Sequence, residues 1–406
     1  RAPSGLTHLR PQDQRSVTRL KLNRLTRRKL RPLLRRPSHP DDGRHTYEEP
    51  RNRSYPPYPR SVVITRYDIS RSDLAELLEG EPNYRIDQVW EGLHSQHREP
   101  AELTNIPKAL RSAIEELLPA ALTPVRQVSS DNGKTLKQLW QLGDGHLLES
   151  VLMHYRDRST VCVSSQAGCA MACSFCATGQ IGFDRHLTSG EIVEQVVRAS
   201  QNAKDKRVSN VVFMGMGEPL ANFENVWSAV ERIHGDLGIG ARKITISTVG
   251  VIPGIERLTQ QDLPVSLAVS LHSANNSIRN QLAPVNRTYP LRKLSEALQS
   301  YKRSKNRRIS LEWAMMAGVN DTETAGRELA EFARPLNAHV NLIPLNPTPG
   351  YDNPGTDHES IAWFQQILES FGVNATIRAN RGTDIDAACG QLRAEHRVKI
   401  SKRRNA

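Results

Sequence analysis

Three cysteines, Cys169, Cys173 and Cys176, lie within one short stretch in the spacing C-x3-C-x2-C. Three thiolates on one loop can bind three irons of a 4Fe–4S cluster and leave the fourth iron open to another ligand. A structural zinc site would need a fourth protein ligand, and the nearest candidate is His186, ten residues beyond Cys176. The spacing therefore predicts an iron–sulfur cluster, and a zinc ion or inert thiols are the alternatives.

Two further cysteines, Cys162 and Cys389, complete the five that the sequence contains. An odd number with this clustering does not resemble the disulfide framework of a small secreted protein. Taken alone, either residue could be a buried free cysteine that only fills the core. Together with the motif, the pattern indicates a metal site accompanied by reactive thiols.

Other candidate residues follow expected strands. The turn Gly215-Met216-Gly217-Glu218 comes directly after one strand, and its glycines would let the backbone approach a ligand closely. Ser247, Ser270 and His272 end other strands, at the edge where α/β proteins form their sites. The alternative is that these residues are ordinary turns and caps.

The elements that must position these residues alternate between strands and helices from about 160 to 350. Short apolar runs predict the strands, and segments with helical periodicity separate them. About six β/α units of this kind predict an α/β fold with a parallel sheet, open or barrel-like. A last helix over 361–371 and a strand over 375–379 lead to Cys389.

Two smaller segments precede this region. Between Ser72 and about Leu118, three apolar stripes predict a small helical module. Residues 123–163 change to short alternating runs, which Asn132-Gly133 and Gly143-Asp144-Gly145 interrupt. This pattern predicts antiparallel hairpins.

The net charge of +12 belongs mostly to one end of the chain. Residues 1–60 hold 16 of the 55 Lys and Arg residues but only 5 of the 43 Asp and Glu residues. We interpret this segment, rich in Arg, Pro and Ser, as mostly disordered. Basic tails favour phosphate backbones, but a merely solvated tail is the alternative. The sequence has no long apolar run and no signal-peptide core, which predicts a cytoplasmic protein without a membrane span.

The cysteine motif, with the aromatic Phe175 before its third cysteine, resembles the radical SAM superfamily. In that superfamily, S-adenosylmethionine (SAM) binds the open iron and is cleaved to methionine and a 5′-deoxyadenosyl radical. Longer stretches resemble the RlmN/Cfr family of RNA adenosine methyltransferases, and they lie at 162–179, 212–220, 246–250, 270–272, 341–347 and 381–392. The resemblance covers roughly residues 70–395 and leaves residues 1–60 outside.

This resemblance implies an α/β fold, a partial (β/α)6 radical SAM barrel with a small N-terminal helical accessory domain. We expect five parts, namely a basic tail (1–60), a helical RNA-binding accessory domain (61–122), a β-hairpin connector (123–160), the radical SAM core (161–395) and a basic C-terminal tail (396–406). In the accessory domain, Arg71, Arg85 and Lys108 could contact phosphates, and a solvated helix face is the alternative.

The resemblance also implies a reaction. Family members methylate carbon 2 of adenosine in the peptidyl transferase centre of 23S rRNA and beside the tRNA anticodon. One SAM molecule methylates Cys389, and a second SAM in the same turnover supplies the radical that abstracts hydrogen from the S-methyl group. The resulting carbon radical adds to adenine, and Cys162 then releases the product by forming a disulfide bond with Cys389. Glu149 matches the family's proton acceptor, although a surface carboxylate on a hairpin is the alternative.

The same resemblance assigns the remaining ligands. Cys169, Cys173 and Cys176 would hold the cluster, and Glu218 would bind the SAM amino group. The expected SAM contacts are Gly217, Glu218, Ser247, Ser270, Leu271, His272 and Asn346. An electron donor such as flavodoxin and a monomeric state are also expected. The rivals are carbon-8 methylation as in the Cfr branch, a radical SAM enzyme with another substrate, and a non-catalytic RNA-binding protein with a structural metal.

Overall fold

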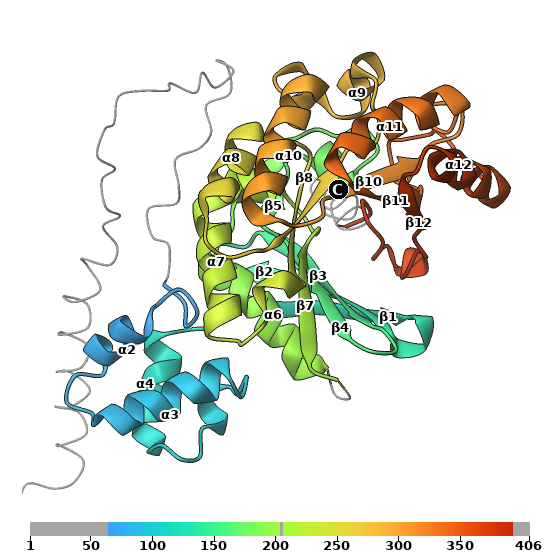
Figure 1. Cartoon of the computed structure of the whole chain (residues 1–406). Coiled ribbons are helices and arrows are strands. Elements are labelled where there is room, and N and C mark those ends of the chain that lie inside the picture. Colours follow the sequence, from blue (N-terminus) through green and yellow to red (C-terminus); the bar gives the residue numbers. More distant parts are fainter. Residues whose placement is uncertain (1–63, 204–205, 393–406) are drawn as a thin grey trace, which may run out of the picture. The chain divides into compact units, whose positions relative to one another are not determined.

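A computed structural model describes residues 64–203 and 206–392. One sheet dominates it, with the strand order β1-β2-β3-β4-β7-β8-β9-β10-β11-β12 (Figure 1). From β4 to β12 in this order, each strand runs parallel to the next one. They are β4 (Ser159–Cys162), β7 (Val208–Phe213), β8 (Ile244–Thr248), β9 (Ser266–Ser270), β10 (Ser310–Met315), β11 (His339–Pro344) and β12 (Asn374–Ile377). Because β1 and β12 end the order without pairing to each other, the sheet is open, which confirms the predicted partial barrel.

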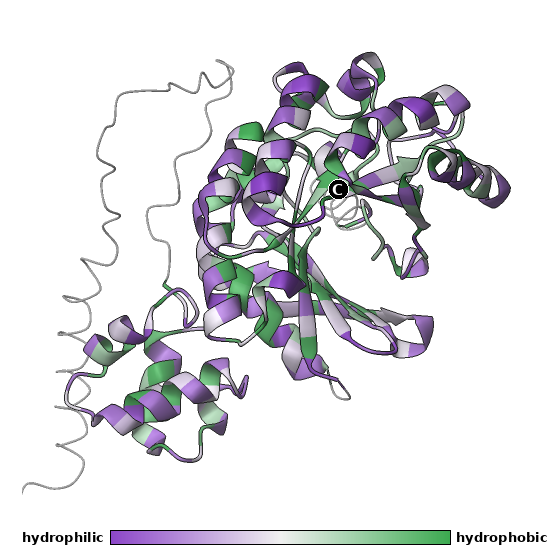
Figure 2. Ribbon diagram, in the orientation of Figure 1, coloured by the Kyte–Doolittle hydropathy of each residue, from purple (hydrophilic) through white to green (hydrophobic). Residues whose placement is uncertain are grey.

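Helices connect the parallel strands and lie along the outer side of the sheet (Figure 1). They are α6 (Ser189–Asn202), α7 (Phe223–Gly235), α8 (Ile252–Gln260), α9 (Asn276–Leu282), α10 (Leu291–Lys305), α11 (Glu323–Leu336) and α12 (His358–Ser370). Figure 2 shows polar and apolar residues within the same helices, as expected where one helix face packs on a sheet. At the start of α6, Glu191 N–H donates to Thr188 Oγ1 (3.1 Å) and Thr188 N–H donates to the Glu191 carboxylate (2.8 Å).

The two faces of the parallel strands differ in character. The residues that face the helices are apolar and at most 1% exposed, and they include Val161, Val211, Ile244, Ile246, Leu267, Val269, Leu311, Trp313, Val340 and Leu342. Successive side chains of a strand point to opposite faces, so the alternate residues face the inside of the open barrel. The hydrophobic core therefore lies between the sheet and the helices.

The predicted hairpins form three antiparallel strands, β1 (Leu122–Ser130), β2 (Thr135–Leu142) and β3 (Leu147–His154). Strand β3 pairs with β4, so these strands extend the barrel sheet itself. The turn between β1 and β2 contains Asn132 with a φ of 56°, a left-handed conformation that asparagine tolerates. The extension gives β4 a neighbour on each side.

The segment around the three clustered cysteines has more structure than the predicted plain loop. Strands β5 (Gln166–Gly168) and β6 (Phe183–His186) form a separate two-stranded sheet, and helix α5 (Ala177–Ile181) lies between them in the chain. These elements are too short to show a periodic pattern, which is why the sequence did not reveal them. The cysteines themselves lie between β5 and α5.

Helices also occupy the region before the sheet, in agreement with the predicted helical module. They are α2 (Arg71–Leu77), α3 (Asn83–His94) and α4 (Lys108–Leu117). Helix α2 begins with a capping box in which Asp73 N–H donates to Ser70 Oγ (3.1 Å). The predicted basic tails, 1–60 and 396–406, lie outside the described residues, and the five-part division of the chain stays a prediction. Among the helices that are described, none is long and apolar enough to cross a membrane.

Candidate active site

A cavity of about 410 Å³ lies inside the open barrel and is lined by the inner face of the sheet. The strand residues that line it include Thr160, Cys162, Asn210, Val212, Thr245, Ser247, Ala268, Ser270, Ser310, Glu312, Ala314, Asn341 and Ile343. About half of the strand residues that line the cavity carry a hydroxyl, amide or carboxyl group, whereas closed barrels usually fill their interior with branched apolar side chains. The interior therefore offers hydrogen-bonding groups to a ligand.

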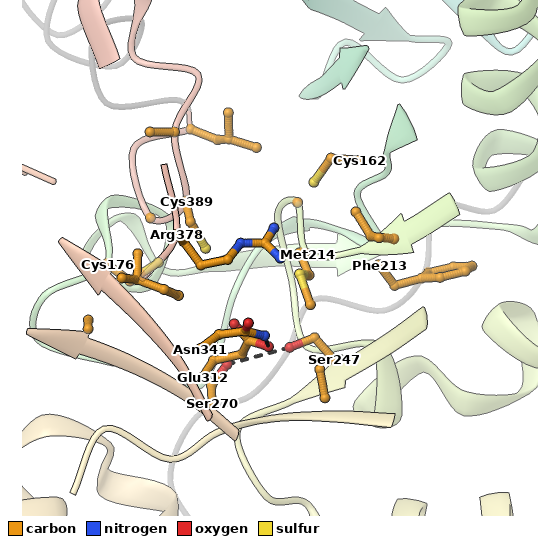
Figure 3. Close-up of a pocket in the computed structure, with 18 of the residues that line it drawn as sticks. Cys162, Cys176, Phe213, Met214, Ser247, Ser270, Glu312, Asn341, Arg378 and Cys389 are labelled. Atoms are coloured by element: carbon orange, nitrogen blue, oxygen red, sulfur yellow. Dashed lines mark hydrogen bonds between the residues drawn. The ribbon is translucent and has the colours of Figure 1, made fainter. Parts of the chain in front are cut away.

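All five cysteines line this one cavity, and all are free thiols. Cys162 ends β4, Cys389 lies in the loop after β12, and the clustered cysteines lie between β5 and α5. Figure 3 shows the side chains of Cys162, Cys176 and Cys389 around the same space. The fold thus brings together the predicted cluster ligands and the two predicted reactive thiols.

The cysteine loop is tightly folded. Cys169 N–H donates to the Gly182 carbonyl oxygen (2.9 Å), and Cys176 N–H donates to the Cys173 carbonyl oxygen (3.2 Å). A side chain at Gly179 would meet the backbone N and O of Cys173 at 3.0 Å. Ala172, directly before Cys173, adopts a φ of 51°, which is uncommon for a residue other than glycine. These restraints hold three thiols on one short loop beside the cavity.

The donor set of this loop fits an iron–sulfur cluster. Within the described part of the chain, no three His, Cys, Asp or Glu side chains converge on a single metal ion. A 4Fe–4S cluster instead takes each thiolate on a separate iron. His186, the fourth ligand of the zinc alternative, does not line the cavity, and its Nδ1 lies 3.0 Å from Gln166 Nε2.

Without a cation, the buried thiols are held in their neutral form. Burial raises the pKa of Cys169 to about 12, and the charges of Glu218 and Cys176 add to the increase. Burial also raises the pKa of Cys173 well above its ordinary value, and the neighbouring thiols strengthen the effect. Bound iron would reverse this preference, because metal coordination favours the thiolate.

The Gly215–Glu218 turn approaches the segment before the cysteine loop closely. Gly217 has a φ of 103°, and a side chain there would come within 2.6 Å of Gln166. Glu218 is buried, and its carboxylate accepts hydrogen bonds from the N–H groups of Leu220 (3.0 Å) and Val249 (2.9 Å). Burial raises the pKa of Glu218 to about 7, and these hydrogen bonds oppose the increase. A cationic group in the cavity would favour the charged carboxylate.

His272 is neutral in this environment. Burial lowers its pKa to about 3, and the charge of Arg279 contributes. Ala314 N–H donates to His272 Nδ1 (3.0 Å), so the ring proton lies on Nε2. The ring also packs edge-on against Phe175, with ring centres 4.6 Å apart. His272 can therefore donate a hydrogen bond from Nε2 within the cavity.

Arg279 is fully buried and was not identified from the sequence. Its guanidinium donates to the carbonyl oxygens of Leu271 (3.1 Å) and Val249 (2.5 Å) and to Asn286 Oδ1 (2.9 Å). Leu271 and Val249 follow β9 and β8, so one side chain fixes the ends of two neighbouring strands. Its helix gives no sequence signal of this, because an arginine in a short polar helix is usually exposed.

A row of polar side chains crosses the cavity floor from β8 to β11 (Figure 3). The hydroxyl oxygens of Ser247 and Ser270 lie 3.5 Å apart, and Asn341 Nδ2 donates to Glu312 Oε1 (2.8 Å). Burial raises the pKa of Glu312, and Arg378 opposes the increase. Ser247 and Ser270 were predicted from the sequence, whereas Glu312, Asn341 and Arg378 were missed. The sequence signal that could have identified Glu312 is that it is a single charged residue within an apolar run.

Cys389 is exposed to the cavity, but protein surrounds it closely. Burial therefore raises the pKa of its thiol to about 12, and the charge of Cys176 contributes. Asn346 Nδ2 donates to the Cys389 carbonyl oxygen (3.1 Å), and Ala177 N–H donates to that of Gly390 (2.8 Å). The Cys389 loop is thus attached to the start of α5, directly after the cysteine cluster. Asn346 lines the cavity, and its contact with SAM stays a prediction.

Cys162 is buried at the end of β4. Burial raises the pKa of its thiol to about 12, the charge of Cys389 adds to the increase, and a hydrogen bond from the Met214 backbone opposes it. The two predicted reactive thiols therefore line the same cavity, and the charge of Cys389 acts on Cys162. No described pair of cysteines forms a disulfide bond.

Glu149 lies on β3, on the same face as Val151 and Met153, which line the cavity. Glu149 itself does not line it, and its Oε1 lies 3.4 Å from Lys137 Nζ. Lys137 Nζ also donates to the Asp386 carbonyl oxygen (3.1 Å) in the Cys389 loop. Lys137 therefore links the predicted proton acceptor to the loop of the predicted nucleophile.

Further bonds of the same kind cross from the last loop to the antiparallel strands. Ser130 Oγ donates to the Asp384 carboxylate, and Arg381 Nη1 donates to the His154 carbonyl oxygen (2.9 Å). Together with the Lys137 bond, these contacts form a seam across the opening of the sheet. The seam joins segment 381–386 to β1, β2 and the end of β3.

The remaining predicted residues do not form part of this arrangement. Leu271 is fully buried and does not line the cavity, although its carbonyl oxygen binds Arg279. Arg71 and Lys108 begin helices α2 and α4, and Arg85 Nε lies 3.9 Å from Glu81 Oε2. The contact of these basic residues with RNA stays a prediction.

Known proteins resemble the chain over most of its length. Residues 163–329 match the family model described as the radical SAM superfamily. A probable dual-specificity RNA methyltransferase RlmN of Chloroflexus aurantiacus is 46% identical, over 82% of this chain and 94% of the relative. A dual-specificity RNA methyltransferase RlmN of Myxococcus xanthus is 45% identical, over 83% of this chain and 96% of the relative. The crystal structure of a radical SAM methyltransferase from Sphaerobacter thermophilus covers 82% of this chain and 100% of its own, with 45% identity and a TM-score of 0.80.

Proposed function

Because the chain belongs to the RlmN family of radical SAM RNA methyltransferases, we propose that it methylates carbon 2 of adenosine in 23S rRNA and in tRNA. It is a SAM-dependent radical methyltransferase that acts on RNA. The observation that carries the more detailed proposal is the shared cavity, which holds the three clustered cysteines together with Cys162 and Cys389. A radical enzyme that only cleaves SAM needs the three cluster cysteines but not Cys162 and Cys389.

Cys169, Cys173 and Cys176 would hold a 4Fe–4S cluster, and the proposed SAM contacts are the predicted residues that line the cavity, Gly217, Glu218, Ser247, Ser270, His272 and Asn346. When bound, the cluster and SAM supply a 5′-deoxyadenosyl radical, with two SAM molecules used in each turnover. The buried Glu218 carboxylate suits the ammonium group of SAM. His272 suits a hydroxyl or ring-nitrogen acceptor, since its Nε2 carries the proton.

Cys389 acts first, as a nucleophile. Its thiolate attacks the methyl carbon of SAM, an S–CH3 bond forms, and S-adenosylhomocysteine leaves. Carbon 2 of adenine has no acidic proton, so this polar transfer would not work on the base directly. The S-methyl group of Cys389 later loses one hydrogen atom, and its carbon forms a bond to carbon 2.

The methylene group must then be released from Cys389. The adduct loses one electron, for which the oxidised cluster held by Cys169, Cys173 and Cys176 would be the acceptor, and it loses the carbon-2 proton, for which we propose Glu149 as the acceptor. The thiolate of Cys162 attacks the Cys389 sulfur, a disulfide bond forms, and the S–CH2 bond breaks. The electron pair passes to the released carbon, which takes a proton and becomes the methyl group. The position of Cys162 and Cys389 in the lining of one cavity supports this assignment.

Three further properties belong to the proposal. We expect an electron donor such as flavodoxin, a monomeric enzyme and a cytoplasmic location. Each rests on the resemblance rather than on a contact in the structure.

Mass spectrometry of the RNA after anaerobic reaction with reductant and SAM tests the proposal. The substrates are an unmodified 23S rRNA fragment and an unmodified tRNA. We expect 2-methyladenosine in both. Formation of 8-methyladenosine would assign the chain to the carbon-8 reaction with the same cysteines, and the absence of methylated adenosine would refute the methyltransferase.

A further inference from the structure

Two arginines contact one tyrosine ring at the edge of the cavity. The guanidinium carbons of Arg158 and Arg381 each lie 4.3 Å from the centre of the Tyr155 ring. Tyr155 and Arg158 belong to the turn between β3 and β4, whereas Arg381 follows β12. All three line the cavity, so the turn between β3 and β4 meets the segment after β12 at the cavity wall. Two cations on one ring repel each other, which makes the arrangement costly unless an anion joins it.

The protein itself neutralises little of this charge. Arg158 pairs with Asp157 (3.1 Å), but both side chains are exposed, and such a pair is weak. Among the described residues, the Arg381 side chain donates only to a neutral carbonyl group, that of His154.

Another cation lies near the same turn. Lys206 Nζ donates to the Tyr155 carbonyl oxygen (3.2 Å) and also to that of Arg156. Of the acidic groups nearby, Asp157 is exposed beside Arg158, and Asp384, in the same segment as Arg381, accepts a hydrogen bond from Ser130. Among the described residues, no buried carboxylate therefore pairs with Arg158 or Arg381.

We propose that Arg158 and Arg381 form a phosphate-binding subsite for the RNA backbone beside the nucleotide that enters the cavity. The inference rests on the proposed function, because it identifies how that substrate is held. A guanidinium group binds a phosphate through two parallel N–H bonds, and Tyr155 keeps two guanidinium planes in fixed orientations. Phosphate contacts position the nucleic acid without reading its sequence. A base that must leave its stack to react needs such support on its flanks.

The test measures the affinity of the full-length holoenzyme for an unmodified tRNA transcript at several salt concentrations. Arg158→Gln should raise the Kd by at least about tenfold, because one charged hydrogen-bonding partner of a phosphate is lost. The slope of log Kd against log salt should fall by about 0.7 for each arginine removed. Arg158→Gln with Arg381→Gln should show both effects more strongly. The affinity for SAM and the visible absorbance of the cluster should stay unchanged.

Arg292→Gln is the matched control, because it removes the same charge from an 80% exposed side chain on α10. It should leave the Kd and the salt slope unchanged. If the Arg158 and Arg381 variants bind tRNA like the wild type while the wild type methylates it, the subsite is wrong and the proposed function stands. A loss of SAM affinity without a loss of RNA affinity would assign the anion to SAM and overturn the inference. If the double variant does not fold, the single variant Arg158→Gln still tests the proposal. Its replacement should not prevent folding, because the Arg158 side chain is 43% exposed.

Discussion

At the scale of single residues, the fold places two cysteines from distant parts of the chain in one cavity with three more. Cys389 is reachable from the cavity, whereas Cys162 is buried at a strand end. This difference matches their proposed order of action, since the first must meet SAM and RNA and the second only the sulfur of the first. Each role can be tested separately.

Replacing Cys389 removes the proposed methyl carrier. Cys389→Ala should retain the cluster but abolish methyl transfer to RNA, with a loss of at least about a thousandfold, since a covalent route is removed. Mass spectrometry of the RNA measures the product, and visible absorbance measures the cluster. Turnover at the wild-type rate would exclude the S-methylcysteine intermediate.

Replacing Cys162 removes the thiol that releases the product. Cys162→Ala should accumulate protein covalently bound to RNA, because the S–CH2 bond to Cys389 can no longer be broken by a neighbouring sulfur. Denaturing gel electrophoresis with labelled RNA detects the adduct. Cys389→Ala serves as the control that cannot form it, and the role given to Cys162 fails if no adduct appears.

Glu218 predicts a pH dependence of SAM binding. Its raised pKa of about 7 means that the carboxyl group is mostly neutral at pH 6 and mostly ionised at pH 7.5. Only the ionised form attracts the SAM ammonium group, so the affinity should be about eightfold lower at pH 6 than at pH 7.5. Equilibrium dialysis measures it. Glu218→Gln should bind weakly with a flat profile, and a flat wild-type profile would contradict the assignment.

The sequence revealed those site residues whose type and spacing carry meaning alone. The clustered cysteines and the Gly215–Glu218 turn are of this kind. Glu312, Lys137 and Arg378 were missed, because their roles depend on which strands and loops face each other. Strand register and loop position are features of the tertiary structure, and a local sequence pattern does not encode them. The long motif matches supplied Glu149 and Asn346, which local patterns would also have missed.

At the scale of elements, helix α9 holds the ends of β8 and β9 through Arg279. A buried guanidinium that binds only neutral oxygens is held there by several hydrogen bonds at once. The strand ends it fixes carry Ser247, Ser270 and His272, all predicted SAM contacts. Stability and substrate binding are therefore linked at this helix.

Removing this arginine should destabilise the protein. Arg279→Met keeps the volume but leaves buried carbonyl groups unpaired, which should lower the free energy of unfolding by about 2–4 kcal/mol. Urea unfolding followed by tryptophan fluorescence measures the change. Arg279→Lys keeps the charge with fewer donors and should cost less, and an unchanged unfolding free energy for Arg279→Met would show that the hydrogen bonds are dispensable.

The sequence predicted the long elements better than the short ones. The parallel strands and the helices α6, α7 and α10 showed clear apolar periods. Helix α9 and strands β5 and β6 are too short for a period to be visible. The antiparallel strands were expected, but their continuity with the barrel sheet depends on pairing between β3 and β4, which the apolar pattern does not encode.

At the scale of the whole sheet, the seam supports the loop that carries Cys389. Strand β12 is an edge strand, so the loop after it has no neighbouring strand on one side. The bonds of Lys137, Ser130 and Arg381 supply that support from the other end of the sheet. The antiparallel extension thus has a function beyond covering an edge.

Weakening the seam should loosen the Cys389 loop while the barrel stays folded. Lys137→Met removes both the bond to the Asp386 carbonyl group and the ion pair with Glu149. Amide hydrogen exchange in residues 383–391 should become at least about threefold faster, because local opening costs less free energy. Lys134→Met, at an exposed neighbouring position, should not change it. Equal exchange rates in the two variants would show that the seam does not restrain the loop.

The alternation along the parallel strands has a consequence for how such an enzyme can evolve. Every second residue packs against the helices and maintains the scaffold, and the residues between them face the cavity and the chemistry. A substitution of a polar residue in the inner row leaves the packing between the sheet and the helices in place, so it can alter the reaction while the scaffold persists. The residues that maintain the fold and the residues that face the reaction therefore occupy alternate positions along the same strand. Descendants of this barrel can therefore acquire new substrates one residue at a time without first losing the ability to fold.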